Sequence, residues 1–114
     1  MRILIVDDEP AVADTLADLI KPLGHEVVVV TDGHAALDRF HRGRYDLVIV
    51  DVVMPAMSGL DVIRKVRAID PTVRIVALTG TGLDFTDILP AAGIRFVHKP
   101  IGTPASIVDL LTGH

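Results

Sequence analysis

Residues 3–8 read ILIVDD, four consecutive apolar residues followed directly by two aspartates. Apolar runs of this length, rich in β-branched residues, are typical of strands that helices cover on both faces of a parallel sheet. Three further runs along the chain also end at a polar residue. The polar residues that close the four runs are Asp7-Asp8, Asp51, Thr79 and Lys99. This repeated pattern predicts an α/β fold with polar side chains at the strand ends.

Segments with helical spacing of their apolar residues separate the runs. We expect strands over residues 3–6, 27–30, 47–50, 75–78 and 94–98. We expect helices from Pro10 to Leu23 before Gly24, from Asp32-Gly33 to Gly43, over residues 59–69, within 84–92 and from Thr103-Pro104 onward. Because Pro90 disfavours helix at the residue before it, the fourth helix should be short or irregular. The alternation predicts a (βα)5 chain that forms one domain over residues 1–114.

The composition excludes several classes of protein. The mean hydropathy of +0.50 is high, but every apolar run is too short for a transmembrane helix. Because the expected first strand begins close to Met1, we expect no signal peptide. No cysteine is present, so disulfides and thiolate zinc sites are excluded. With a net charge of -4 and no basic run, we expect a cytoplasmic domain that binds neither nucleic acid nor membrane.

The strand-end residues should meet at one edge of the sheet, because ligands of open α/β sheets bind beyond the carboxyl ends of the strands. Asp7, Asp8 and Asp51 would then share a crevice. Two carboxylates about 4 Å apart repel by about 4 kcal/mol at an effective dielectric of about 20, so the cluster would take up protons or a cation. Carboxylate oxygens without thiolates favour Mg2+. A carboxylate beside Mg2+ is also a possible nucleophile toward a phosphoryl group.

Each of these residues has a simpler explanation when it is taken alone. Asp7 or Asp8 could cap a helix, Thr79 could be a turn residue, and Lys99 could be a solvated lysine at a turn. Asp51 is harder to explain in this way, since apolar residues surround it. The coincidence of all of them at strand ends favours a functional site.

The same residues resemble the receiver domain of two-component response regulators, the family that includes the bacterial chemotaxis regulator. The resemblance runs from residue 1 to about residue 111. It rests on four stretches in order, namely residues 3–9, residues 51–60, Thr79-Gly80 and Lys99-Pro100. It implies a flavodoxin-like, doubly wound, five-stranded parallel sheet with strand order 2-1-3-4-5, the order of the chemotaxis regulator. It also implies a cis peptide bond between Lys99 and Pro100.

The resemblance further implies a role for each site residue. Asp51 would be the phosphoacceptor, and Asp8 and Asp51 would bind Mg2+ directly. Asp7 would act on the metal through water, and the backbone carbonyl of Val53 would complete the ligands. Thr79 and Lys99 would contact phosphoryl oxygens, and Phe96 would be the aromatic residue of a switch. Val53 and Thr81 would occupy the variable positions that set the lifetime of the phosphoryl group.

The function implied is that of a phosphorylation-controlled switch. A histidine kinase or a histidine phosphotransfer protein would supply the phosphoryl group. Phosphorylation would reshape the surface formed by residues 84–92, strand 94–98 and the last helix, which an unknown downstream protein would read. Such a domain is not an enzyme beyond its own phosphorylation and dephosphorylation.

Two other interpretations remain open. The chain could be a degenerate receiver that binds a protein constitutively. It could also be a phosphohydrolase with Asp51 as its nucleophile, like haloacid dehalogenases. Those enzymes place a second aspartate two residues after the nucleophile, where this chain has Val53.

Overall fold

The computed structural model describes residues 1–52, 59–79, 94–98 and 104–112 of the chain. In these residues the strands are β1 (Arg2–Val6), β2 (Glu26–Val30), β3 (Leu47–Asp51), β4 (Arg74–Thr79) and β5 (Ile94–His98). The helices are α1 (Pro10–Ile20), the 3-10 turn η1 (Lys21–Leu23), α2 (Gly33–Arg39), α3 (Gly59–Ile69) and α4 (Pro104–Thr112). The expected irregular helix within 84–92 and the Lys99-Pro100 bond lie outside the described residues.

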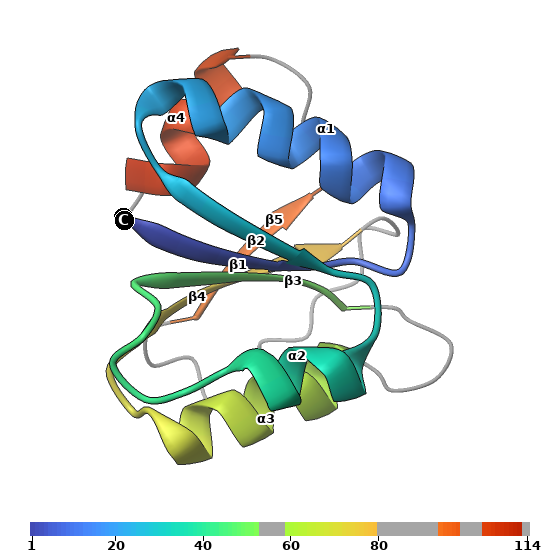
Figure 1. The fold of residues 1–114 in the computed structure, drawn as a ribbon, viewed down its shortest axis with the longest axis vertical. Helices are drawn as coiled ribbons and strands as arrows, with labels where there is room; N and C mark the ends of the chain where they lie inside the picture. Colours follow the sequence, from blue (N-terminus) through green and yellow to red (C-terminus); the bar gives the residue numbers. More distant parts are fainter. Residues whose placement is uncertain (53–58, 80–93, 99–103, 113–114) are drawn as a thin grey trace.

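All five strands form one parallel sheet in the order β2-β1-β3-β4-β5, which confirms the predicted topology. Helices α1 and α4 cover one face of the sheet, and α2 and α3 cover the other (Figure 1). The register pairs Val6 of β1 with Val50 of β3, so these two central strands end side by side. Asp51 then pairs with Leu78, one residue before the end of β4. The topology therefore brings the strand-end residues to the same edge.

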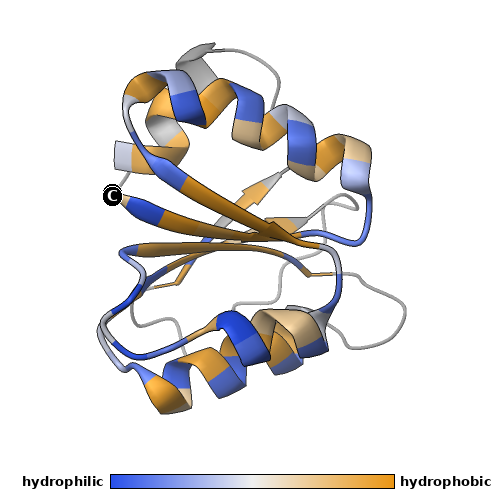
Figure 2. Ribbon diagram, in the orientation of Figure 1, coloured by the Kyte–Doolittle hydropathy of each residue, from blue (hydrophilic) through white to orange (hydrophobic). Residues whose placement is uncertain are grey.

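The core lies in two layers, one on each face of the sheet (Figure 2). Successive residues of β1 alternate between them: Leu4 and Val6 pack toward α2 and α3, and Ile3 and Ile5 pack toward α1 and α4. Residues 3–6 and 47–50 are fully buried. This explains why the central strands read as continuous apolar runs rather than as alternating ones.

Two helix ends differ from the sequence prediction. α1 ends at Ile20 and continues as the 3-10 turn η1, which Gly24 closes with a φ of +92°. A 3-10 turn has three residues per turn, so Leu23 leaves the apolar stripe and is 50% exposed. α2 ends at Arg39 rather than at Gly43, and Gly43 has a φ of +77° in the connection that follows. Both glycines adopt the left-handed conformation that other residues avoid.

A buried carboxylate organises the connection between α3 and β4. Asp70 is 5% exposed, and its Oδ1 accepts hydrogen bonds from the backbone N and the Oγ1 of Thr72, both at 2.9 Å, and from the backbone N of Val73 at 3.2 Å. Its Oδ2 accepts a hydrogen bond from the backbone N of Gly43 at 3.4 Å. These hydrogen bonds, those from Thr72 first, lower the pKa of Asp70. The side chain thus ties together two loops at the amino end of the sheet.

The guanidinium of Arg67 supports the same connection. Its Nη1 donates to the backbone carbonyls of Val73 at 2.6 Å and Pro71 at 3.1 Å. Burial lowers the pKa of Arg67, although the charge of Asp70 opposes that effect. Arg67 therefore stabilises the connection between α3 and β4 and is not simply a solvated arginine on the surface of α3.

None of the helices in the described part of the chain has the length and apolar character needed to cross a membrane.

Candidate functional site

Three carboxylates meet at the carboxyl edge of the sheet. Asp7 and Asp8 follow the last residue of β1, and Asp51 is the last residue of the adjacent strand β3. One carboxylate oxygen from each lies within 4.8 Å of the others. Asp7 is completely buried, Asp51 is 5% exposed, and Asp8 is partly exposed. The cluster thus has two buried members and one that opens toward solvent.

The backbone around Asp7 is fixed by hydrogen bonds on both sides. Its N–H donates to the carbonyl of Val30 at 3.1 Å, which extends the pairing of β1 with β2. Its Oδ1 accepts from the N–H of Glu9 at 3.0 Å. Glu9, and neither aspartate, is the N-cap residue of α1, and Pro10 occupies the first turn. The interpretation of Asp7 or Asp8 as the helix cap is therefore wrong for α1. Asp7 instead shapes the turn that leads into the helix.

Asp51 is held by β4 and by the start of α3. The N–H of the next residue, Val52, donates to the carbonyl of Leu78 at 3.0 Å, and the N–H of Gly59 donates to the carbonyl of Val52 at 2.9 Å. A Cβ atom at residue 59 would overlap the backbone carbonyl of Asp51 and lie 2.7 Å from the Cα of Val52. Only glycine permits this close approach. In the sequence, Gly59 looks like an ordinary residue at the start of a helix, so this contact could not be predicted.

The donor set fits a divalent cation. Opposite ligands of an octahedral Mg2+ lie about 4.2 Å apart, since each ligand distance is about 2.1 Å. Oxygens within 4.8 Å of one another could therefore ligate one ion after small side-chain adjustments. Burial raises the cost of three neighbouring negative charges, and a cation would offset it. Hard oxygen donors without a thiolate match Mg2+ better than zinc.

The remaining site residues are described in part or not at all. Thr79 ends β4, and its backbone pairs with His98, the last residue of β5. Phe96 lies within β5 opposite Ala77. The side chains of Thr79 and Phe96, and all of Val53 and Lys99, lie outside the described residues. The backbone nevertheless places Thr79 on the same edge of the sheet as the three aspartates.

Comparison with known proteins agrees with this architecture. The family model described as "Response regulator receiver domain" matches residues 3–112. The sensory transduction protein RegX3 of Mycobacterium tuberculosis is 50% identical over 100 residues, which cover 86% of this chain and 44% of that protein. The chain therefore spans less than half the length of this relative.

Two relatives from Thermotoga maritima are of similar size to this chain. The chemotaxis protein CheY is 32% identical over 113 residues, covering 96% of this chain and 93% of CheY. The crystal structure of the response regulator protein TrrA in complex with Mg2+-BeF superposes with a TM-score of 0.76 at 34% identity, covering 87% of this chain and 86% of TrrA. The match of the family model to nearly the whole chain, together with the observed strand order, shows that this chain belongs to the response regulator receiver domain family.

Proposed function

We propose that the chain is a phosphorylation-controlled signalling switch in which Asp51 accepts the phosphoryl group. Receiver domains are signalling domains of two-component systems rather than classical enzymes. The observation that supports Asp51 is its place at the end of a central strand, with oxygens of Asp7 and Asp8 within 4.8 Å. Asp51 would be the nucleophile and would share the metal with Asp8, while Asp7 would act on the metal through water.

In the proposed reaction, a carboxylate oxygen of Asp51 attacks the phosphorus of a phosphohistidine. The donor is a histidine kinase or a histidine phosphotransfer protein. The P–O bond to Asp51 forms, the P–N bond to the histidine breaks, and the imidazole retains the electron pair of the broken bond. Asp8, Asp51 and the backbone carbonyl of Val53 would hold Mg2+, with Asp7 acting through water, and the ion would supply positive charge opposite the phosphoryl oxygens. The complex of TrrA with Mg2+-BeF supports this assignment by analogy.

The proposed switch connects the phosphoryl group to the outer strands of the sheet. Thr79 ends β4, and Lys99 directly follows β5. Charge-assisted hydrogen bonds are worth about 1.5–3 kcal/mol each, so two would supply about 3–6 kcal/mol. Inverting a two-state population from 1:99 to 99:1 takes about 5.5 kcal/mol. The free energy of the two contacts is therefore comparable to that needed to move Thr79 toward Asp51 and to let Phe96 turn inward.

Incubation with acetyl phosphate and Mg2+, followed by mass spectrometry, tests the phosphoacceptor. The chain should gain one phosphoryl mass, and Asp51→Asn should abolish the gain. Asp38→Asn is the control, because Asp38 is exposed on α2 and belongs to no part of the cluster. Continuous turnover of acetyl phosphate would instead indicate a phosphohydrolase. No modification would indicate a constitutive binding module.

Backbone NMR with beryllofluoride tests the switch. The largest shift changes should extend from Thr79 to Ile101, through β5 and toward α4. Thr79→Ala should confine the changes to residues that touch the beryllofluoride. The coupling is wrong if Thr79→Ala leaves the full pattern intact.

A further inference from the structure

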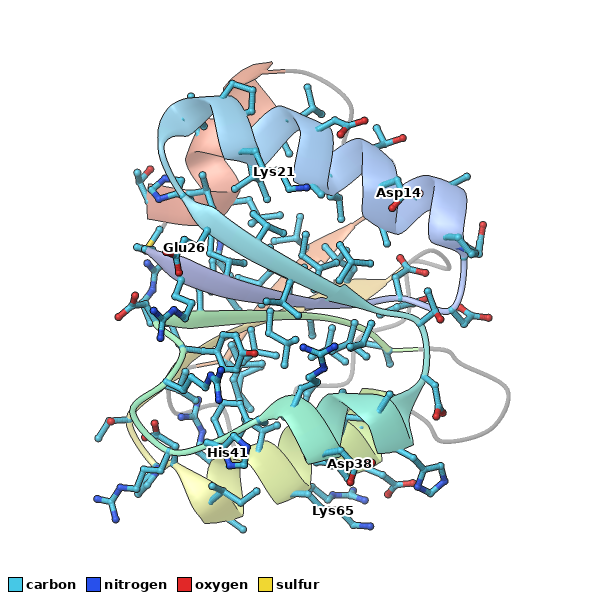
Figure 3. All side chains as sticks on the ribbon, in the orientation of Figure 1. Asp14, Lys21, Glu26, Asp38, His41 and Lys65 are labelled. Atoms are coloured by element: carbon cyan, nitrogen blue, oxygen red, sulfur yellow. The ribbon has the colours of Figure 1, made fainter. Side chains whose placement is uncertain are left out.

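A cavity of about 310 Å³ opens at the end of the sheet opposite the three aspartates. It lies between the first residues of the edge strand β2 and the end of α2. Figure 3 labels three of its lining residues, Glu26 on β2, Asp38 on α2 and His41 just after α2. Five-residue strands are about 17 Å long, which separates this cavity from Asp51. It is therefore distinct from the proposed phosphorylation site.

The inner wall of the cavity is fixed by packing and hydrogen bonds. Tyr45 is 6% exposed, and its ring stacks on Phe40 with centroids 6.0 Å apart and planes 18° apart. At the rim, the Nε of Arg2 forms an ion pair with the Oε2 of Glu26 at 2.9 Å. The Nη1 of Arg2 also donates to the backbone carbonyl of Arg44 at 3.5 Å. The buried, stacked Tyr45 gives the cavity a packed inner wall, whereas the rim ion pair is exposed to solvent.

The cationic groups of the cavity exceed its anionic groups. Within the described residues, the guanidinium groups of Arg39 and Arg44 form no ion pair or hydrogen bond. The charge of Glu26 is already matched by Arg2, which leaves Asp38 as the other lining carboxylate. The chain as a whole has a net charge of -4, so this local excess of positive charge runs against its composition. A guanidinium presents a planar fork of donors that matches the paired oxygens of carboxylate and phosphate.

We propose that this cavity binds a small molecule through a phosphoryl or carboxylate group held by Arg39 and Arg44, with Asp38 accepting a hydrogen bond from a hydroxyl or amino group of the same ligand. The volume is at the lower end of the range for small-molecule sites, so the ligand is compact. Among the described residues that line the wall, Val28 and Tyr45 are the apolar ones, and the mainly polar wall favours a polar ligand over a lipid or a drug-like aromatic one.

NMR titration with inorganic phosphate and, separately, with succinate tests the site. The titrations use the Asp51→Asn variant in buffer without divalent cations, so that the aspartate cluster does not contribute. Amide shifts should saturate and should centre on residues 38–45 and on Val28. The double variant Arg39→Ala/Arg44→Ala should raise the apparent Kd at least about tenfold, since a tenfold change corresponds to the loss of one charge-assisted hydrogen bond.

Arg42→Ala is the matched control. Arg42 lies in the same exposed loop and carries the same charge, but it does not line the cavity. It should change the Kd less than twofold, and all variants should keep the thermal midpoint of the parent. A preference between phosphate and succinate identifies which oxyanion the site takes. Linear, non-saturating shifts, or an equal effect of Arg42→Ala, would overturn the proposal, and neither result would bear on phosphorylation of Asp51.

Discussion

Gly59 lies so close to the backbone of Asp51 that any side chain at residue 59 would overlap the Asp51 carbonyl oxygen. In an ordinary helix interior, Gly→Ala stabilises by roughly 1 kcal/mol. At residue 59 we expect the substitution to destabilise the folded chain instead. Gly59→Ala should lower the free energy of unfolding by about 1–3 kcal/mol, as overpacking does, and should slow phosphorylation by acetyl phosphate. Urea denaturation and labelling kinetics measure the two effects.

Ala68→Gly provides the comparison for this prediction, because Ala68 is exposed on the same helix. It should destabilise by no more than about 1 kcal/mol and leave labelling unchanged. A Gly59→Ala variant that is more stable than the parent and labels at the same rate would show that the contact does not constrain Asp51.

Asp70 should make the stability of the chain depend on pH. Its pKa in the folded chain is lowered by hydrogen bonds to its carboxylate, above all those from Thr72. A lowered folded pKa contributes stability above the unfolded pKa of about 3.9, and that contribution is lost as the pH falls through the folded pKa. Asp70→Asn should therefore be less stable than the parent at pH 7, with the difference shrinking below about pH 4.

Denaturation at pH 7, 5 and 3 measures this difference. Asp38→Asn is again the control, because the side chain of Asp38 forms no hydrogen bond or ion pair within the described residues. It should match the parent at all three values. A gap between Asp70→Asn and the parent that widens toward pH 3 would contradict the prediction.

Arg67 and Arg64 provide a matched pair of arginines on α3. Arg67→Ala removes the donor to the carbonyls of Pro71 and Val73 and should cost about 1–3 kcal/mol of unfolding free energy. Arg64→Ala removes an exposed ion pair to Asp61 at 3.6 Å and should cost less than about 1 kcal/mol. Denaturation midpoints compare the two. Equal losses would mean that the Arg67 contacts do not stabilise the connection.

Mg2+ should stabilise the folded chain through the aspartate cluster. At a free concentration of 100 times its Kd, a ligand that binds only the folded state adds about 2.7 kcal/mol. Asp8→Ala should remove most of this gain, because Asp8 is a proposed direct ligand of the ion within the cluster. Thermal unfolding with and without Mg2+ measures it, with Asp38→Asn as the control. If Mg2+ stabilised Asp8→Ala as much as the parent, the ion would bind outside the aspartate cluster.

Val53 should set the lifetime of the phosphoryl group. Its position follows Asp51 by two residues, and an apolar side chain cannot orient an attacking water. Val53→Asn should change the dephosphorylation rate more than the affinity for Mg2+, unless Thr81 already orients the water. Single-turnover decay of the labelled chain measures the rate, and Thr81→Val tests the compensation. Identical decay in the parent, Val53→Asn and Thr81→Val would refute this role.

The strands and the aspartate cluster could be predicted because short-range pattern and topology determine them. Apolar runs such as residues 47–50 are buried on both sides, and a parallel sheet places their polar endings together. The contacts of Gly59 and Arg67 could not be predicted in this way. They depend on how α3 packs against the segments that precede and follow it. The sequence pattern of a helix does not show whether a glycine or an arginine on it contacts solvent or the backbone of another segment. The predicted end of the first helix at Leu23 is wrong for a different reason, since the chain changes from α-helix to a 3-10 turn after Ile20.

The strand order also predicts how strongly different strands resist hydrogen exchange. Asp51 ends β3 and Asp7-Asp8 follow β1, and both of these strands have partners on both sides. Within the described residues, β5 is an edge strand that pairs with β4 alone. Amides of the central strands should exchange only through the largest openings of the molecule, and amides of β5 through smaller ones. The proposed switch residue, Phe96, therefore lies on a strand that we expect to open more easily than the strands that hold the aspartates.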